Sequence, residues 1–484
     1  MKQKQLLAGV HIVSTNVTED LEITDVVYDS RKVTPGCLFV AVSGFATDGN
    51  RYIPMALEKG AALVVTAKPQ PDSVPHVQVA SDRLALAQIG CNFFGHPGDA
   101  MQMVGITGTN GKTSSVLLLK HILEETLGAK VGLIGTMGNM IGDVSVPGDR
   151  TTPESFELQS LLAQMRDAGC THVVMEVSSH AIALDRIAGL HYTVAAFTNL
   201  TEDHLDFHKT MEHYCDTKAE LFARCEKAVC NVDDPWFDRM TQKAACEMIT
   251  ISAKGDAKLW AENQELFSDG IAFTAINGNE KVPVCLPIPG KFTVYNALTA
   301  LGCAMALGIA LDRAAAALHT AQGVKGRVEV VPTPGKDYTV LIDYAHTPDG
   351  LENVLTSVKG FCKGRLIAVF GCGGDRDPVK RPIMGRIGVE IADYAIITSD
   401  NPRTEDPGKI IQDILKGVDS SKNNYEVLEN RPKAIQHAMD IAKKNDIIVL
   451  AGKGHETYQE ICGVKHHLDE REVVADYLAE TRNG

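Results

Sequence analysis

The sequence predicts an α/β fold of several domains, built on mostly parallel sheets. From about residue 99 onward, short apolar runs alternate with helical patterns, which is typical of buried parallel strands joined by helices. A glycine-rich loop at residues 105–113 follows one of these runs and opens a helix. The 484-residue chain is too long for one ordinary core, so about two to four domains are expected.

The composition is that of an ordinary globular protein, with 44% hydrophobic and 22% charged residues. A net charge of −14 argues against a nucleic-acid-binding face, although it is compatible with a local basic pocket for a small anion. The 12 cysteines include no CxxC pair, so we expect free thiols in a reducing cytoplasm rather than a zinc cluster or disulfides. No signal peptide or apolar run of roughly 18 residues is present, so no membrane insertion is expected.

Residues 1–98 form the first predicted domain, a small α/β unit. Strands are predicted at residues 26–31, 38–42 and 62–66, and a helix at about 53–59. The turn-rich stretch 95–99 marks the boundary with the next domain.

Residues 99–325 form the second predicted domain, whose glycine-rich loop predicts a nucleotide phosphate site. The loop lies between the apolar run 101–106 and an amphipathic helix at 116–127. Backbone N–H groups at the helix start would face the anion, Lys112 would reach the outer phosphates, and the Thr113 hydroxyl would hold Mg²⁺. The glycine spacing departs from the strict GxxxxGK[ST] motif. A loop that served only a tight turn would leave Lys112 and Thr113 unexplained.

Strands are also predicted in this domain at residues 131–135, 171–176, 195–199 and 228–231. The second boundary lies near residues 322–327, and residues 326–484 form the third domain. Its predicted strands are residues 339–343, 366–370, 394–398 and 446–450.

Each strand of the third domain ends in a polar or glycine-rich cluster. Ligands bind outside the carboxyl ends of the strands in open α/β sheets. Four such clusters are hard to attribute to folding alone, so they predict a binding site. They lie at residues 343–346, 371–376, 400–403 and 452–456.

These clusters, in their order along the chain, resemble the Mur ligase family, the ATP-dependent amide-forming enzymes of peptidoglycan precursor synthesis. The resemblance covers essentially the whole chain and is close to the members that add the third residue of the peptide. It implies a UDP-binding N-terminal domain, a central P-loop-type ATPase domain and a Rossmann-like C-terminal domain. The matching stretches are residues 108–113, 151–153, 175–180, 198–206, 214–218, 296, 326–327, 343–348 and 400–403.

The resemblance implies γ-phosphoryl transfer from ATP to a carboxylate, followed by attack of an amine on the acyl phosphate. Such catalysis consists mainly of positioning and electrostatic stabilisation. Lys112, His204 and Lys218 are the implied catalytic residues. Thr113 and Glu176 are expected to hold the nucleotide-bound Mg²⁺, and His204 a second Mg²⁺.

Lys218 is expected to carry a carbamate, which turns a cation into a carboxylate-like metal ligand. Its spacing from Tyr214, four residues earlier, fits this role and also fits an ordinary surface lysine on a helix over residues 211–224.

The resemblance also implies two sets of substrate contacts, in which Arg327 and Asp343 reach the nucleotide from the linker and the C-terminal domain. ATP would be bound by Gly108, Thr109, Asn110, Gly111, Lys112, Thr113, Asn296, Arg327 and Asp343. The UDP-sugar dipeptide would be bound by Ser30, Thr151, Thr152, Ser178 and Arg186.

Two positions depart from the family's pattern. Lys325 stands where the linker normally has proline, so the hinge is in doubt. Leu184 stands where some members have a polar residue, so that substrate contact is in doubt.

The stretch Asp400, Asn401, Pro402 and Arg403 resembles the signature of members that add meso-2,6-diaminopimelate. This substrate has a second carboxylate, which a planar guanidinium binds in bidentate fashion. L-Lysine lacks that carboxylate, so Arg403 would stay unpaired and repel it. Arg376, Gly452 and Glu456 match the other contacts, and Glu456 suits the distal ammonium.

The expected activity is therefore ATP-dependent addition of meso-2,6-diaminopimelate to UDP-N-acetylmuramoyl-L-alanyl-D-glutamate by a cytoplasmic monomer. Three alternatives stay open at this point. They are an L-lysine-adding relative, a folylpolyglutamate synthase-like ligase with the same ATPase core, and a regulatory protein that binds nucleotide without forming a bond. Because nucleotide and amino-acid motifs lie in different domains, we also expect domain closure during the reaction.

Overall fold

The computed structural model describes residues 1–44, 47–148 and 150–482. The chain divides into two compact units, residues 1–260 with 298–314, and residues 261–297 with 315–484. Three elements cross this division, namely β14 (Leu259–Leu266), α10 (Lys291–Ala306) and α11 (Leu311–Leu318). No helix in the described ranges is long and apolar enough to cross a membrane.

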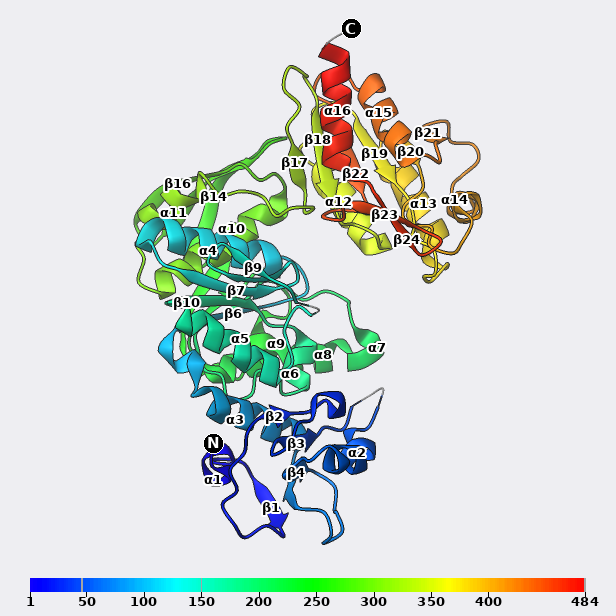
Figure 1. The fold of residues 1–484 in the computed structure, drawn as a ribbon. Coiled ribbons are helices and arrows are strands. Elements are labelled where there is room, and N and C mark those ends of the chain that lie inside the picture. Colours follow the sequence, from blue (N-terminus) through cyan, green and yellow to red (C-terminus); the bar gives the residue numbers. More distant parts are fainter. Residues whose placement is uncertain (45–46, 149, 483–484) are drawn as a thin grey trace. The chain divides into compact units, whose positions relative to one another are not determined.

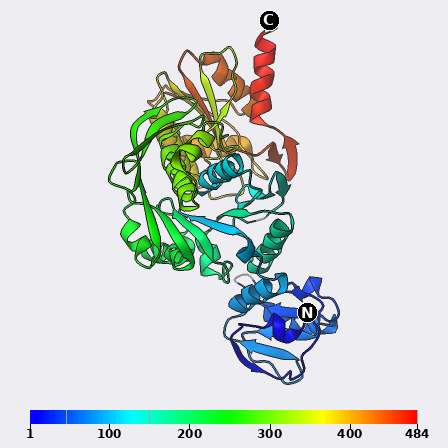
Figure 2. The same ribbon diagram turned by 90° about the vertical axis from the view of Figure 1, so that its left-hand side faces the viewer.

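The first unit begins with a small sheet, drawn in blue in Figures 1 and 2. Its strand order is β1-β5-β4-β3-β2, and only β1 runs antiparallel to its neighbour. The elements are α1 (Gln3–Leu6), β1 (Ile12–Thr15), β2 (Val26–Val27), β3 (Leu38–Ala41), α2 (Ile53–Glu58), β4 (Leu63–Thr66), β5 (His76–Val79) and α3 (Asp82–Phe94), with short 3-10 turns η1 (Ser30–Lys32), η2 (Gly49–Tyr52) and η3 (Pro97–Ala100).

The predicted elements β3, β4 and α2 are confirmed to within one residue. β2 is shorter than predicted, because Asp29 accepts a bond from Arg31 N and starts the turn η1. The elements α1, β1, β5 and α3 were not predicted from the sequence. All four residues of β1 are exposed, so the strand carries no apolar alternation that could have revealed it.

The second sheet has eleven strands, and its part from β13 onward, which belongs to the first unit, has the order β13-β12-β11-β6-β10-β7-β8-β9. The strands from β13 to β7 are parallel, as predicted, while β8 and β9 add an antiparallel edge. The strands are β6 (Gln102–Thr107), β7 (Val131–Gly135), β8 (Gly138–Ile141), β9 (Val144–Val146), β10 (His172–Glu176), β11 (Tyr192–Phe197), β12 (Cys225–Asn231) and β13 (Glu247–Ser252).

Helices connect these strands and bury an apolar core against the sheet. The phosphate loop follows β6 directly and opens α4, as the sequence predicts. The helices are α4 (Lys112–Leu127), α5 (Ser155–Asp167), α6 (Ser179–Ala183), α7 (Leu205–His208), α8 (Met211–Ala219) and α9 (Phe237–Thr241), with the turn η4 (Glu220–Arg224) after α8.

The second unit is built on a six-stranded sheet of order β17-β18-β22-β19-β20-β21, in which only β17 is antiparallel. All four predicted strands are confirmed to within one residue. The strands are β17 (Glu329–Val331), β18 (Thr339–Asp343), β19 (Leu366–Phe370), β20 (Tyr394–Ile397), β21 (Tyr425–Val427) and β22 (Ile447–Ala451). Two antiparallel hairpins complete the unit, β15 (Ile271–Asn277) with β16 (Glu280–Leu286), and β23 (Tyr458–Ile461) with β24 (Val464–His467).

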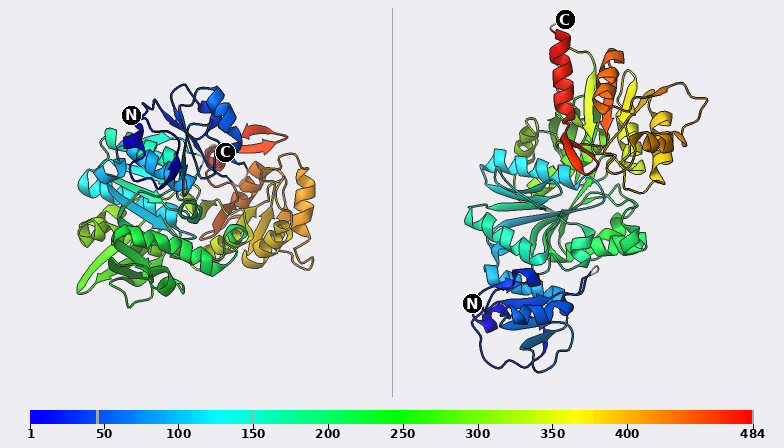
Figure 3. Two further views of the ribbon diagram at one scale, coloured as in Figure 1. Left: turned by 90° about the horizontal axis from the view of Figure 1, so that it is seen from below. Right: turned by 45° about the vertical axis from the view of Figure 1, so that its right-hand side comes forward.

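Helices cover both faces of this sheet, because alternate residues of its buried strands point to opposite sides. One face packs against α12 (Pro348–Lys359), α13 (Lys380–Ile391) and α14 (Pro407–Leu415). The other face packs against α15 (Arg431–Ile441) and α16 (Glu470–Arg482), which lie side by side (Figure 3). The core is formed by the strands and these helices, so the loops after the carboxyl ends of the strands can carry polar residues for binding.

We predict that Ile448→Ala destabilises the protein by about 2–5 kcal/mol, because it leaves a cavity in a fully buried strand. Ile448 is 0% exposed in β22 and packs toward α15 and α16. The measurement is the urea unfolding free energy. Val427→Ala, at a 41% exposed position on the edge strand β21, should change it by less than about 0.5 kcal/mol. Equal effects of the two changes would contradict the predicted core.

Candidate active site

Two glycines give the phosphate loop its shape. Gly108 has φ +148°, and a Cβ there would lie 2.0 Å from the Thr198 hydroxyl oxygen. Gly111 has φ +84° and forms the N-cap of α4. A Cβ at 108 would clash, so glycine is favoured there by both sterics and backbone conformation, and at 111 by backbone conformation.

The loop is held in place by the residues that follow β11. Thr109 N donates to Asn199 O at 2.8 Å, and Asn110 N donates to the Asn199 side-chain oxygen at 2.9 Å. The Thr198 hydroxyl donates to Asn110 O at 2.7 Å. The Thr-Asn pair that begins the acidic stretch 198–206 thus has a structural role beside any catalytic one.

Two lysines converge on the carbonyl oxygen of Gly108. Lys112 Nζ and Lys218 Nζ each donate to it at 2.9 Å. Lys112 also donates to Thr109 O at 2.9 Å. The loop therefore concentrates positive charge at the start of a helix, where an anion is also favoured by the helix dipole.

Lys218 is buried at 1% exposure on α8, which excludes the surface-lysine interpretation. Its ammonium lies 4.8 Å from the ring centroid of Tyr214. Burial, reinforced by the charge of Lys112, holds the pKa of Lys218 well below its usual range. A lowered pKa increases the fraction of Lys218 that is a neutral amine, which is the nucleophilic form of the side chain.

Glu176 ends β10 and gathers hydroxyl groups around its carboxylate. It is 1% exposed and accepts hydrogen bonds from the Thr113 hydroxyl at 3.0 Å and from Thr136 N at 2.9 Å, both on Oε1. The Thr136 hydroxyl donates to Oε2 at 3.1 Å. Carboxylate and hydroxyl oxygens are the ligands that Mg²⁺ prefers, so the residues present fit the predicted ion.

His204 lies in an aromatic cluster with His180 and Tyr214. The structure shows no contact between His204 and Glu176 among the described residues. The His204 ring is 4.8 Å from that of His180 and 6.3 Å from that of Tyr214. Within residues 1–44, 47–148 and 150–482, no three His, Cys, Asp or Glu side chains are grouped to hold a metal ion. The predicted second metal site therefore stays a prediction.

Four of the five predicted UDP-substrate residues lie together beside Glu176. The Thr152 hydroxyl donates to Glu176 O at 2.8 Å and lies 3.4 Å from Ser178 Oγ. Thr151 Oγ1 lies 3.0 Å from Thr136 Oγ1, and Arg186 donates to Thr152 O at 3.3 Å. The fifth, Ser30, is buried in η1 and is not bonded to this group in the described chain. Leu184 is the C-cap of α6.

In the second unit, the linker is packed against two strand-end loops. Gly326 has φ +74°, and a Cβ there would lie 2.3 Å from His455 N. Tyr344 N donates to Gly326 O at 2.9 Å, and the Arg327 guanidinium lies 5.4 Å from the Tyr344 ring centroid. Lys325 is exposed, so the replacement of proline there creates no clash.

The predicted nucleotide residue Asp343 ends β18 and accepts a bond from Val328 N at 2.8 Å. Burial raises the pKa of Asp343. Asn296 is 4% exposed on α10. Their contacts with ATP stay predictions.

Arg403 is held by the hairpin β23–β24, which the sequence reading did not predict. Its backbone N donates to Glu460 O at 3.0 Å, and its carbonyl accepts from Cys462 N at 2.7 Å. Its guanidinium donates to Gly374 O at 2.7 Å and lies 3.5 Å from the Glu460 carboxylate. Arg403 has φ +50°, a left-handed conformation that these bonds must offset.

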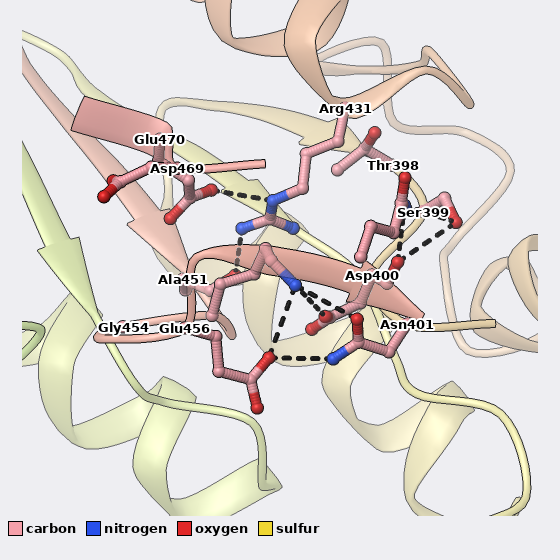
Figure 4. Close-up of polar contacts among 12 residues, drawn as sticks. Thr398, Ser399, Asp400, Asn401, Arg431, Ala451, Gly454, Glu456, Asp469 and Glu470 are labelled. Carbon is pink, nitrogen blue, oxygen red and sulfur yellow. Dashed lines mark hydrogen bonds and ion pairs between the residues drawn. The ribbon is translucent and has the colours of Figure 1, made fainter. Parts of the chain in front are cut away.

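Asp400 and Asn401 follow β20, Glu456 follows β22, and the three side chains lie together although β19 separates the two strands (Figure 4). Asn401 Nδ2 donates to Glu456 Oε2 at 2.8 Å. Gly452 has φ +120°, and a Cβ there would lie 2.5 Å from the Asp400 carboxylate. Arg376 is exposed and donates to Asp375 O at 3.2 Å. Pro402 is buried between Asn401 and Arg403.

The comparisons with known proteins agree with this geometry. Three family models match successive stretches of the chain, Mur ligase family, catalytic domain (residues 22–93), Mur ligase middle domain (106–304) and Mur ligase, glutamate ligase domain (326–454). The chain belongs to the Mur ligase family. The predicted α/β Mur ligase architecture is therefore confirmed.

Two Mur ligase relatives match nearly end to end, and both are named UDP-N-acetylmuramoyl-L-alanyl-D-glutamate--2,6-diaminopimelate ligase. The one from Clostridium botulinum is 48% identical over 95% of this chain and 96% of its own, and the one from Clostridium tetani is 45% identical over 99% and 100%. A solved structure with the same name has TM-score 0.76 and 31% identity, over 97% of this chain and 99% of its own.

Several residues in and around the site of this Mur ligase belong to no recognisable sequence motif, so they could not be predicted from the sequence. Thr136 and Glu460 are single polar residues in unremarkable contexts. Lys453 lies within the predicted cluster at residues 452–456, but nothing in the sequence shows that its side chain is buried. Arg431 and Glu470 form an ion pair with both side chains 0% exposed, and 39 residues separate them.

A buried histidine near this site should make stability depend on pH. Burial, reinforced by His180, lowers the pKa of His208 from 6.5 to about 4. Between these values the unfolded chain binds more protons than the folded one, so the unfolding free energy should fall as pH drops from 6.5 towards 4.

We predict that His208→Gln flattens this dependence, as measured by urea unfolding at several pH values. His191→Gln, at an exposed ring, is the matched control and should keep the wild-type slope. An unchanged slope in His208→Gln would show that other groups cause the acid sensitivity.

Proposed function

We propose that this Mur ligase adds meso-2,6-diaminopimelate to UDP-N-acetylmuramoyl-L-alanyl-D-glutamate with hydrolysis of ATP to ADP and phosphate. The observation that carries the proposal is the match along nearly the whole chain to relatives of that name. The position of Arg403 at a strand end, beside a cluster of carboxylates, supports the choice of amino acid. The product is a precursor of peptidoglycan, which links the enzyme to cell shape and division.

The reaction proceeds through an acyl phosphate. The D-glutamate carboxylate attacks the γ-phosphorus of ATP, and ADP leaves. The amine of diaminopimelate then attacks the acyl carbon, and phosphate leaves while the amine loses its proton. Lys112 and the backbone N–H groups at the start of α4 orient the phosphates and offset their charge. Mg²⁺, when bound by Thr113 and Glu176, supplies further charge neutralisation.

Lys218 acts, in this proposal, as a carbamate. The neutral amine attacks CO₂, forming an N–C bond and releasing one proton. The new carboxylate-like group places an anion near the Lys112 cation, so the charges at the two positions attract one another. The burial of Lys218 and its lowered pKa support this step. With His204, the carbamate is proposed to hold the second Mg²⁺.

We assign residues 1–98 to UDP-substrate binding, 99–325 to ATP binding and 326–484 to amino-acid binding, in a cytoplasmic monomer. The three family models at residues 22–93, 106–304 and 326–454 support these boundaries. Thr151, Thr152, Ser178 and Arg186 would hold the UDP substrate together with Ser30. Asn296, Arg327 and Asp343 would contact ATP. Arg376, Asp400, Asn401, Pro402, Arg403, Gly452 and Glu456 would form the diaminopimelate site.

We predict phosphate release with ATP, Mg²⁺, the UDP-dipeptide substrate and meso-2,6-diaminopimelate, but not with L-lysine. Arg403→Ala should lower kcat/KM for diaminopimelate by about 30-fold or more, equivalent to about 2 kcal/mol, because a desolvated charge pair is lost. Arg386→Ala, at a 56% exposed position on α13, should leave it unchanged.

Other outcomes point to the alternatives. Release with lysine would keep the ligase and overturn the specificity argument. Release with neither amino acid would favour a regulatory nucleotide-binding protein or a folate-type ligase. The solved Mycobacterium tuberculosis folylpolyglutamate synthase is only 18% identical, with TM-score 0.61, so that likeness concerns the fold alone.

The carbamate gives a separate spectroscopic prediction. Protein equilibrated with ¹³C-bicarbonate should show one carbamate ¹³C resonance that is absent in Lys218→Met, and this variant should lose ligase activity. Lys243→Met, at a 51% exposed position, should keep both the resonance and the activity. A wild-type enzyme that is active without this resonance would contradict the proposed modification.

A further inference from the structure

We infer that Lys453 is a positioning residue of the amino-acid site, whose buried ammonium orients Glu456 and Asn401 for the cationic end of the incoming amino acid. This inference rests on the proposed function and goes beyond it by assigning a role to a residue that touches no substrate. Lys453 follows β22 in the cluster at residues 452–456.

Lys453 is 0% exposed, and its ammonium is surrounded by oxygens. Nζ lies 3.1 Å from Asn401 Oδ1, 3.3 Å from Glu456 Oε2 and 3.7 Å from Asp400 Oδ1. A buried ammonium is costly unless it is paired and hydrogen-bonded. These three oxygens provide that pairing, so the position of each is coupled to the presence of Lys453.

The side chain of Asn401 makes three hydrogen bonds to its neighbours. Its oxygen accepts from Lys453 Nζ and from Glu460 N at 2.9 Å, and its nitrogen donates to Glu456 Oε2 at 2.8 Å. An amide held between two donors and one acceptor has a single orientation. Asn401 therefore transmits the position of Lys453 to Glu456, although the motif suggests a direct substrate contact.

Glu456 receives both of these bonds on one carboxylate oxygen. Lys453 and Asn401 both donate to Oε2, and the side chain is 14% exposed. Within the part of the chain that the structure describes, Oε1 is thus the oxygen that a ligand would meet. This arrangement fixes Oε2 and leaves Oε1 for a ligand.

The charges of the cluster also leave room for one more cation. Lys453 and Arg431 face three carboxylates, those of Asp400, Glu456 and Glu470 (Figure 4). Burial lowers the pKa of Arg431, but the charges of Glu470 and Asp400 outweigh this effect and raise it. The nearby Asp469 is paired with Arg471 at 3.0 Å.

The cluster therefore carries one excess negative charge, which an ammonium group of the substrate would neutralise. Without Lys453 the excess would be two, and the buried carboxylates would repel one another. Lys453 thus sets both the geometry and the charge of the site.

The test is Lys453→Met, which removes the charge and keeps the length of the side chain. In the full-length enzyme, acceptor-dependent phosphate release should show a KM for diaminopimelate raised about tenfold or more, since one partner of a buried pair is removed. The KM values for ATP and the UDP substrate, and kcat at saturating diaminopimelate, should stay near wild type. The matched control is Lys465→Met. Lys465 is exposed on β24, and its Nζ lies 4.1 Å from the Tyr458 ring centroid.

A purely structural role for Lys453 would give a different result. In that case the melting temperature of Lys453→Met would fall, and all KM values and kcat would change together. Alternatively, KM for diaminopimelate would not change. Either result overturns the inference. Absence of diaminopimelate-dependent phosphate release in the wild type would instead overturn the proposed function.

A comparison of Glu456→Gln with the double variant carries the test where Lys453→Met does not fold. Glu456→Gln combined with Lys453→Met removes both charges of that pair, so of the carboxylates around Lys453 only Asp400 loses a partner. If Lys453 acts through Glu456, the double variant should have a KM for diaminopimelate close to that of Glu456→Gln alone. A further tenfold increase, as expected for independent effects, would overturn the inference.

Discussion

The functional geometry depends on one constraint, the alignment of parallel strands, whose carboxyl ends meet at one edge of a sheet. Buried strands must fill their length with apolar residues, so polar groups collect in the loops just beyond it. In the first unit this edge presents Gly108 after β6, Glu176 after β10 and Thr198 after β11. In the second unit it presents Asp343, Asp400 and Gly452.

Buried lysines serve opposite purposes at these two edges. Lys218 lies beside a second cation, so burial favours its neutral form and makes it reactive. Lys453 lies among three oxygens that hold its ammonium in place. The difference comes from the neighbours and not from burial itself, because a low dielectric strengthens attraction and repulsion alike. The exposed fraction of a buried lysine therefore does not by itself indicate its role.

In the proposed amino-acid site, recognition would combine two charges of opposite sign. Arg403 is kept in a left-handed conformation by backbone bonds to the hairpin β23–β24, and Glu456 is held by Asn401 and Lys453. Glu460 connects the two, since its N–H bonds to Asn401 and its carbonyl accepts from Arg403 N. A substrate with both a carboxylate and an ammonium at its far end would match this pair, whereas lysine has no carboxylate for Arg403 to bind.

The sequence by itself determined the parallel strands, the phosphate loop and the family. These features depend on local apolar patterns, on glycines such as Gly108, and on ordered motifs. Only the tertiary structure decided the pairing of Arg431 with Glu470, the hairpin that holds Arg403, and the burial of Lys453 and Lys218. Such contacts join residues that are far apart in the chain. The sequence does not show whether a charged side chain is solvated or buried. The chemistry of such a side chain is set by neighbours that folding alone brings together.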